Sequence, residues 1–284
     1  MNILVLGSTG MAGHMISIYL KEAGHDVTSF TRKKFNYCDN IVGDITDFNY
    51  LKSIIMDGNY DAVINAIGIL NQDAEDNKSH AVLLNAYLPH YLSDITKNMK
   101  TRVIHMSTDC VFSGKTGGYT EYSFRDGETF YDRSKALGEL ENGKDLTFRN
   151  SIIGPDMNKD GIGLFNWFMK QENKVNGFTK AIWTGVTTLT LAKAMEKALE
   201  VNLTGIYNLV NNEHINKYEL LELFNKYMKD NGLEVLPSDA VVLDKSLINN
   251  RTDFEFIVPT YEEMVKEMKK WIDDHKDLYP HYIE

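Results

Sequence analysis

The first 25 residues carry the pattern that most constrains the fold of this chain. "NILVLG" at 2–7 is a short, fully apolar run that ends in glycine, and "MAGHMISIYLKEAGH" at 11–25 is typical of a helix closed by Gly24. A fully apolar strand is characteristic of parallel sheets, which helices cover on both faces. The N-terminus therefore predicts a buried strand, a sharp turn and a helix.

This turn contains three regularly spaced glycines. Gly7, Gly10 and Gly13 form a G-x-x-G-x-x-G pattern. Glycine lets the backbone turn sharply and lets a ligand approach closely, while the amides at the start of the next helix favour a phosphate. In a first strand-to-helix turn the pattern predicts dinucleotide binding. The alternative is a tight turn without a ligand.

Strands and helices continue to alternate over the first half of the chain. Apolar runs at 26–32, 61–68, 102–112 and 146–154 are expected strands, and segments at 50–60, 78–98 and 131–141 are expected helices. This order predicts an α/β fold of the Rossmann type, with a doubly wound parallel sheet over residues 1–154. Residues 155–284 predict a smaller, mostly helical substrate-binding lobe, with one strand near 205–210 that returns to the main sheet.

The end of the second strand bears on the cofactor, because an acidic residue there would bond the ribose 2′-hydroxyl of NAD. The sequence "FTRKK" places Thr31, Arg32, Lys33 and Lys34 at this point, without a carboxylate. Cations favour a 2′-phosphate, so NADP(H) is the preferred cofactor and NAD(H) the alternative. A solvated basic turn would explain the same residues.

A possible pair for acid–base chemistry follows in "FYDRSKALGE", where Tyr131 and Lys135 lie one helical turn apart on one face. Reduction of a ketone adds a hydride to carbon and a proton to oxygen. A phenol is a poor acid–base catalyst near pH 7, and a nearby ammonium lowers its pKa. Ser107 and Thr108 come at the C-terminal edge of the sheet, where one of them could hold the substrate oxygen. Alone, Y-x-x-x-K is as easily a surface tyrosine and a solvated lysine.

The composition excludes several classes of partner. The formal net charge is -10 and the sequence has no long basic run, which argues against nucleic acid. It also has no apolar run long enough to cross a bilayer and no leader-like N-terminus, so we expect a cytoplasmic protein without membrane association. Cys38 and Cys110 are too few for a disulfide framework and suit a reducing compartment. The scattered histidines lack metal-ligand spacing, so no metal is expected.

Together, "GSTGMAG", "GDITD", "NAIG", "STDCVFSG", "YDRSK" and "FRNSIIGP" resemble the extended short-chain dehydrogenases/reductases, and more narrowly the dTDP-4-dehydrorhamnose reductase family, over nearly the whole chain. The resemblance implies a catalytic triad of Thr108, Tyr131 and Lys135, in which Tyr131 protonates the C4 oxygen while the nicotinamide delivers hydride to C4. It implies that Asp44 and Ile45 border the adenine, although "GDITD" could be a simple turn. The cofactor contacts that it implies are Gly7, Thr9, Gly10, Met11, Gly13, Thr31, Arg32, Asp44, Ile45, Asn65, Ala66, Ile67, Gly68, Tyr131 and Lys135.

The resemblance also implies a substrate, the C4 ketone of a 4-keto-6-deoxy sugar nucleotide used in surface polysaccharide biosynthesis. The family usually has Tyr at Cys110, Gly at Asp132 and often Trp at Ile152, so a UDP-linked N-acetyl sugar is an alternative to the dTDP sugar. Arg251 lies where related enzymes often bind the diphosphate. The residues expected at the substrate are Ser107, Val111, Trp167, Asn176, Trp183, Thr184 and Arg251, although the last five each fit a structural role as well.

Two other functions compete with the reductase. A 4-epimerase or 4,6-dehydratase would share the fold, but epimerases retain bound NAD, and dehydratases carry a second acid where this chain has Cys110 after Asp109. The third candidate is a non-catalytic, nucleotide-binding regulatory subunit, against which the intact set of Thr108, Tyr131 and Lys135 argues. Related reductases are often homodimers, which is the expected assembly.

Overall fold

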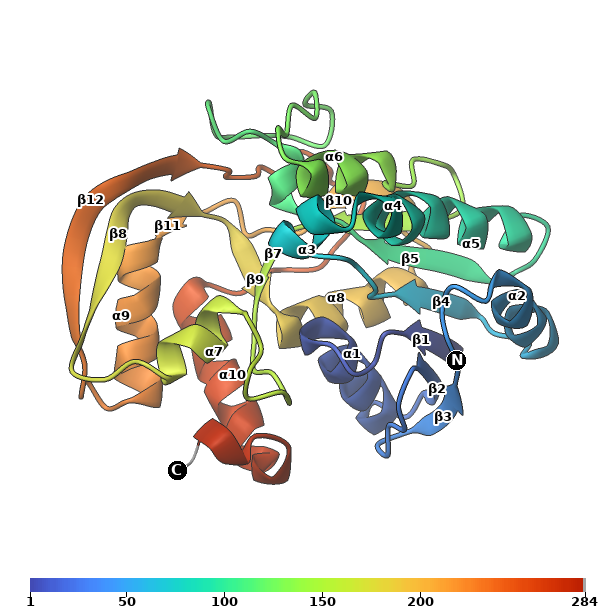
Figure 1. The fold of residues 1–284 in the computed structure, drawn as a ribbon, viewed down its shortest axis with the longest axis horizontal. Helices are drawn as coiled ribbons and strands as arrows, with labels where there is room; N and C mark the ends of the chain where they lie inside the picture. The colour runs from blue at the N-terminus through green and yellow to red at the C-terminus, as the bar shows by residue number, and fades with distance from the viewer. Residues whose placement is uncertain (283–284) are drawn as a thin grey trace.

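A seven-stranded parallel sheet forms the centre of the protein in the computed structural model, which describes residues 1–282 (Figure 1). Its strands are β1 (Asn2–Leu6), β2 (Asp26–Thr31), β3 (Asp39–Val42), β4 (Ala62–Asn65), β5 (Arg102–Met106), β6 (Leu146–Arg149) and β10 (Gly205–Asn208). They follow the order β10-β6-β5-β4-β1-β2-β3, with parallel pairing throughout. The chain reverses its progress across the sheet at β1, and α/β proteins bind ligands at such a switch point. The predicted doubly wound sheet is confirmed, with β3 as an additional edge strand.

Alternate residues of the central strands face opposite layers of helices. In β1, Ile3 and Val5 belong to the core with α1 (Met11–Glu22) and α8 (Thr188–Glu200). Leu4 and Leu6 belong to the core with α2 (Phe48–Asp57) and α5 (Leu88–Thr96) on the other face. All four side chains are fully buried. A strand with helices on both faces has no solvent side, which explains why residues 3–6 are all apolar.

The segment predicted as one helix at 78–98 contains a wider turn. It is made of α4 (Lys78–Ala81), a π-helical segment η1 (Val82–Tyr87) and α5. Asn85 in η1 donates from Nδ2 to the carbonyl of Ile69 (2.9 Å) and to Oγ of Ser134 (3.0 Å), and its Oδ1 accepts the N–H of Ile69 (2.8 Å). The π turn thus links the loop after β4 to the helix that carries Ser134. Such turns are frequent at functional sites.

The second lobe contains more strand than the sequence predicts. A three-stranded sheet with the order β11-β8-β12 lies beside the helices α7, α9 and α10 (Figure 1). The mostly helical prediction missed β8 and β12 because these long strands alternate exposed and buried residues only irregularly. The remaining elements are α3 (Asn71–Asp76), η2 (Asp109–Val111), α6 (Phe130–Leu137), β7 (Ser151–Ile153), α7 (Leu164–Met169), β8 (Lys174–Trp183), β9 (Gly185–Thr187), β11 (Ile215–Asn216), α9 (Lys217–Met228), β12 (Glu234–Asp244), α10 (Tyr261–Asp274), η3 (Lys276–Leu278) and η4 (Pro280–Tyr282).

The two lobes are interleaved in sequence. The segment 205–210, which was predicted to return to the main sheet, contains β10, and this strand pairs with β6 at the edge of that sheet. The helix α8 packs against α1 on one face of that sheet. The main lobe thus takes elements from both sides of residue 154, which is the boundary predicted from the sequence.

Within residues 1–282, no helix combines the length and the apolar character needed to cross a membrane. In the same part of the chain, no three His, Cys, Asp or Glu side chains gather into a potential metal site.

Candidate active site

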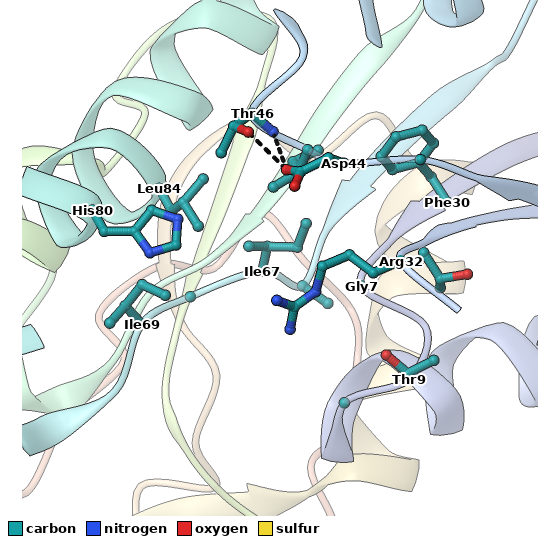
Figure 2. A pocket seen from close by; sticks show the side chains of 16 residues that line it. Gly7, Thr9, Phe30, Arg32, Asp44, Thr46, Ile67, Ile69, His80 and Leu84 are labelled. Carbon is teal, nitrogen blue, oxygen red and sulfur yellow. Dashed lines mark hydrogen bonds between the residues drawn. The ribbon is translucent and has the colours of Figure 1, made fainter. Parts of the chain in front are cut away.

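The glycine turn borders a cavity of about 340 Å³ at the C-terminal ends of β1, β2 and β4 (Figure 2). Gly7 has φ +90°, a conformation that residues with side chains rarely adopt. A Cβ at Gly13 would lie 2.1 Å from the carbonyl oxygen of Gly7, so the helix can approach the strand only with glycine there. After Gly10, the first-turn amides of α1 have no intrahelical partner, which favours a phosphate.

Arg32 and Asp44 contribute opposite charges to this first cavity. Figure 2 shows the Arg32 side chain extending into the cavity on the side of Ile67. Oδ1 of Asp44 accepts the N–H (2.9 Å) and the hydroxyl (2.7 Å) of Thr46, and these bonds hold the pKa of Asp44 below its ordinary value. The predicted cofactor residues that line the cavity are Gly7, Thr9, Gly10, Thr31, Arg32, Asp44, Ile45, Ala66, Ile67 and Gly68.

A second cavity of about 380 Å³ brings the predicted catalytic residues together. Thr108, Tyr131 and Lys135 all line it, and so do Ser107 and Met11. Both cavities share Gly10, Ala66, Ile67 and Gly68, so they form one continuous hollow along the C-terminal edge of the sheet. A long ligand bound at the glycine turn would therefore reach the tyrosine.

Local capping fixes the catalytic side chains. The helix α6 begins with a capping box, in which Thr129 Oγ1 accepts the N–H of Asp132 (3.1 Å) and Asp132 Oδ2 accepts the N–H of Thr129 (3.2 Å). This role explains an aspartate where the family usually has glycine. Thr108 Oγ1 accepts the N–H of Cys110 (3.2 Å) and so caps the 3₁₀ turn η2.

Burial sets the protonation of the pair. It raises the pKa of Tyr131 well above its ordinary value. Electrostatic interaction with Cys110 and Asp109 adds to this increase, and a hydrogen bond with Thr108 opposes it. Burial also lowers the pKa of Lys135 to about 8, against the attraction of Glu139. Nζ of Lys135 donates to the carbonyl of Met106 at 2.6 Å. Near pH 7 the site thus holds a neutral phenol beside an ammonium that is close to losing its proton.

The comparisons with known proteins agree with this geometry. The sequence model of the family described as "RmlD substrate binding domain" matches residues 1–243. The chain belongs to this family. It is 27% identical to the spore coat polysaccharide biosynthesis protein SpsK of Bacillus subtilis (strain 168), over 82% of this chain and 80% of the relative. It is 29% identical to a dTDP-4-dehydrorhamnose reductase of Burkholderia thailandensis, over 74% and 72%.

The fold is shared with solved members of the family. The structure of dTDP-4-dehydrorhamnose reductase from Bacillus anthracis, in complex with NADP, superposes with a TM-score of 0.80 at 20% identity. The match covers 96% of this chain and 99% of that one. The predicted Rossmann-type fold is therefore confirmed.

A buried ionic network supports the strand end that carries Thr108. Arg149 donates from Nε and Nη2 to both carboxylate oxygens of Glu139 (2.8 and 2.7 Å), and both side chains are almost fully buried. Arg125 Nε donates to Glu139 Oε2 at 2.6 Å, and Ser107 Oγ donates to Glu139 Oε1 at 2.6 Å. The pKa of Glu139 is lowered because bonds from Arg149 and its neighbours outweigh burial. The hydroxyl of Ser107, a predicted substrate contact, is thus engaged in this network.

Asn65 on β4 and His105 on β5 form a second layer of contacts to the catalytic Lys135. Asn65 Oδ1 accepts the N–H of Ile67 (3.2 Å), and Nδ2 contacts Nδ1 of His105 (3.2 Å). Nε2 of His105 lies 3.4 Å from Nζ of Lys135. Asn65, predicted to contact the cofactor, is fully buried and acts through these bonds. A role for His105 was not predicted, because one histidine inside a strand carries no spacing signal.

Six of the seven predicted substrate residues, including Arg251, do not line either cavity. Val111 is fully buried against Phe112 and its neighbours. Trp183 is buried and its Nε1 donates to Oγ of Ser151 (2.8 Å), a residue that lines the second cavity. Thr184 Oγ1 accepts the N–H of Leu247 (2.8 Å). Trp167 and Asn176 are exposed on α7 and β8.

The structure corrects the expectation for Arg251. Its Nη1 donates to the carbonyls of Thr204 (2.6 Å) and Ile206 (2.8 Å), and its Nη2 donates to Asp253 (2.5 Å). These carbonyls lie at the start of β10, whereas both cavities lie at the C-terminal edge of the sheet. An arginine occupied in this way cannot also hold a diphosphate at the opposite edge.

Several residues that line the second cavity were not predicted to bind a ligand. Cys110 and Ile152 were noted only as departures from the family pattern, and both face the cavity. Their presence inside recognised motifs was the available signal. The other lining residues without an assigned role are Ala12, Leu70, Asn71, Met106, Asp109, Asn150 and Ser151.

Proposed function

We propose that this chain reduces the C4 ketone of a 4-keto-6-deoxy sugar nucleotide, with NADPH as the preferred cofactor. The observation that carries the proposal is the convergence of Thr108, Tyr131 and Lys135 on a cavity continuous with the glycine turn. A regulatory subunit that only binds a nucleotide would not need this set. Family membership and relatives named as sugar-nucleotide reductases support the same reaction class.

The chain's own residues suit a cofactor of this kind. The free amides of α1 favour the pyrophosphate, and the close approach at Gly13 keeps the helix against the turn. Arg32 extends into the cavity where the adenosine ribose would lie, and a guanidinium suits a 2′-phosphate. NADPH, when bound, would supply the hydride.

The proton comes from Tyr131. Its neutral phenol donates to the ketone oxygen as negative charge develops there, and Thr108 holds that oxygen in line. The phenolate that remains is stabilised by the ammonium of Lys135 on the same helix face. Burial of all three groups strengthens these interactions, because the local dielectric is low.

The sugar is a 4-keto-6-deoxy hexose linked to dTDP or to UDP as an N-acetyl sugar. Ile152 lines the cavity where the family often has tryptophan, and Cys110 lines it where the family usually has tyrosine. Both changes leave a smaller side chain at the sugar, which favours a substrate bulkier than dTDP-4-dehydrorhamnose. A relative named for spore coat polysaccharide biosynthesis supports a role in surface polysaccharide synthesis.

The test is NADPH oxidation at 340 nm with dTDP-4-keto-6-deoxy sugars and UDP-linked 4-keto N-acetyl sugars. We expect turnover on one of these, reduced at least about 100-fold in Tyr131→Phe, because general acid catalysis contributes roughly 10²–10⁴-fold. Tyr91→Phe is the matched control, since its hydroxyl bonds the carbonyl of Phe48 away from the site. NADPH binding without turnover on any sugar would refute the reductase, and tightly bound NAD in the purified protein would favour the epimerase.

A further inference from the structure

The side chains of Asn65, His105 and Lys135 form a line from β4 through β5 to α6. His105 is fully buried between the other two. Its Nδ1 lies 3.2 Å from Nδ2 of Asn65, and its Nε2 lies 3.4 Å from Nζ of Lys135. The line therefore ends on the lysine of the catalytic set. The position of the hydrogen on His105 decides whether Nζ of Lys135 faces an N–H or a lone pair.

The backbone fixes the first hydrogen of this line. Ile67 donates its N–H to Oδ1 of Asn65, so that oxygen must be the acceptor and Nδ2 must face His105. An amide Nδ2 can only donate, which requires a lone pair on Nδ1 of the imidazole. A neutral imidazole with a lone pair on Nδ1 carries its hydrogen on Nε2. Burial keeps His105 neutral, because it lowers the pKa of the imidazole well below its ordinary value.

The N–H on Nε2 then points at Lys135. An ammonium has three hydrogens and no lone pair, so it cannot accept this bond, whereas a neutral amine can. The carbonyl of Met106 accepts from Lys135 in either state. We propose that Asn65 and His105 are positioning residues for Lys135, which aim an imidazole N–H at its Nζ and thereby disfavour its charged form.

The effect of this contact on turnover rests on the proposed function, whereas the tautomer of His105 does not. Once Lys135 is neutral, the phenolate of Tyr131 loses its counter-charge, and turnover falls on the alkaline side. Other groups act on the same lysine and its histidine. Glu139, just after α6, favours the ammonium, Tyr131 shares the lysine's helix face, and His90 on α5 disfavours a charge on His105. Since these groups are unchanged in His105 variants, the effect of the imidazole can be measured separately.

The experiment has two independent readouts. The first is the ¹⁵N spectrum of histidine-labelled protein without ligands, with His105 assigned by its loss in His105→Gln. We expect the Nε2–H tautomer from pH 6 to 9, with a shift of the Nε2 resonance as Lys135 titrates near pH 8. An Nδ1–H tautomer or an imidazolium over this range would overturn the proposal, whether or not a substrate has been found.

The second readout is the pH profile of kcat. His105→Gln offers the lysine a carbonyl, and His105→Phe removes the N–H at similar volume, so both should move the alkaline limb upward by roughly one pH unit. His275→Gln is the control, because this histidine bonds the carbonyl of Trp271 and the carboxylate of Glu22, away from the site. Unchanged limbs in both His105 variants, with urea unfolding showing an intact fold, would refute the role. Wild-type protein without turnover on any sugar would instead refute the proposed function and leave the spectrum to decide.

Discussion

Replacing Gly13 by alanine should damage the fold, whereas the same change at Gly10 should damage binding. A Cβ at Gly13 would lie 2.1 Å from the oxygen and 2.7 Å from the carbon of the Gly7 carbonyl, where real Cβ contacts stop near 3.0 Å. Every atom in the way belongs to the backbone, so strand and helix must separate by roughly 1 Å. Overpacking by one methyl costs about 1–3 kcal/mol, and more against backbone, while alanine regains about 1 kcal/mol of helix propensity.

We therefore expect Gly13→Ala to lower the free energy of unfolding by about 2 kcal/mol, or the melting temperature by about 4–8 °C. A Cβ at Gly10 would be 3.5 Å from the oxygen of Gly7, which is an ordinary contact, and its φ of -86° suits any residue. Because Gly10 lines both cavities, Gly10→Ala should keep its stability within about 0.5 kcal/mol and bind NADPH at least about tenfold more weakly.

Urea unfolding and NADPH fluorescence titration on both variants separate these effects. The reasoning is refuted if Gly13→Ala is as stable as the wild type, or if Gly10→Ala is the less stable of the two.

Three further predictions concern residues with distinct roles. Arg251→Ala should lower the free energy of unfolding by about 1–3 kcal/mol, because its bonds to the carbonyls of Thr204 and Ile206 are lost. The KM for the substrate should stay within about twofold of the wild type, and a large rise in KM would support a diphosphate contact. Arg32→Ala should weaken NADPH binding roughly 10–100-fold in titrations while NADH binding changes little; equal losses would argue against a 2′-phosphate contact. Burial lowers the pKa of His14 to about 4, so the unfolded chain takes up this proton first and stability is lost as pH falls from 6.5 towards 4. Urea unfolding should show a loss between pH 7 and 4.5 that is about 2–3 kcal/mol smaller in His14→Gln, and equal losses would contradict this origin.

The part of the site that could be predicted from sequence is the part that local geometry dictates. The glycine turn needs residues without Cβ at fixed spacing, and a phenol and an ammonium can share a helix face only three or four positions apart. These constraints act over a few residues, so they are visible in the sequence. The main sheet follows from the same kind of regularity, in apolar runs and helix spacing.

What could not be predicted depends on partners distant in the chain. The role of His105 depends on Asn65 on a neighbouring strand and on Lys135 thirty positions later. Arg251 is held by carbonyls more than forty positions earlier, and family position alone suggested the opposite edge of the sheet. The sheet of the second lobe was missed because β8 and β12 pair across some sixty residues and only partly bury one face.

The interleaving of the lobes has a consequence for how the protein is made. A chain grows from its N-terminus, and domains generally fold as units when they are complete. The edge of the main sheet is closed by β10, and α1 is covered by α8, so the glycine turn is fully supported only after Asn208 has been synthesised. Until then β6 exposes an unpaired edge, which is a template for pairing with another chain. A nascent chain that stops before residue 208 should therefore be more sensitive to protease and more prone to aggregate than one long enough to include β10 and β12 outside the ribosome.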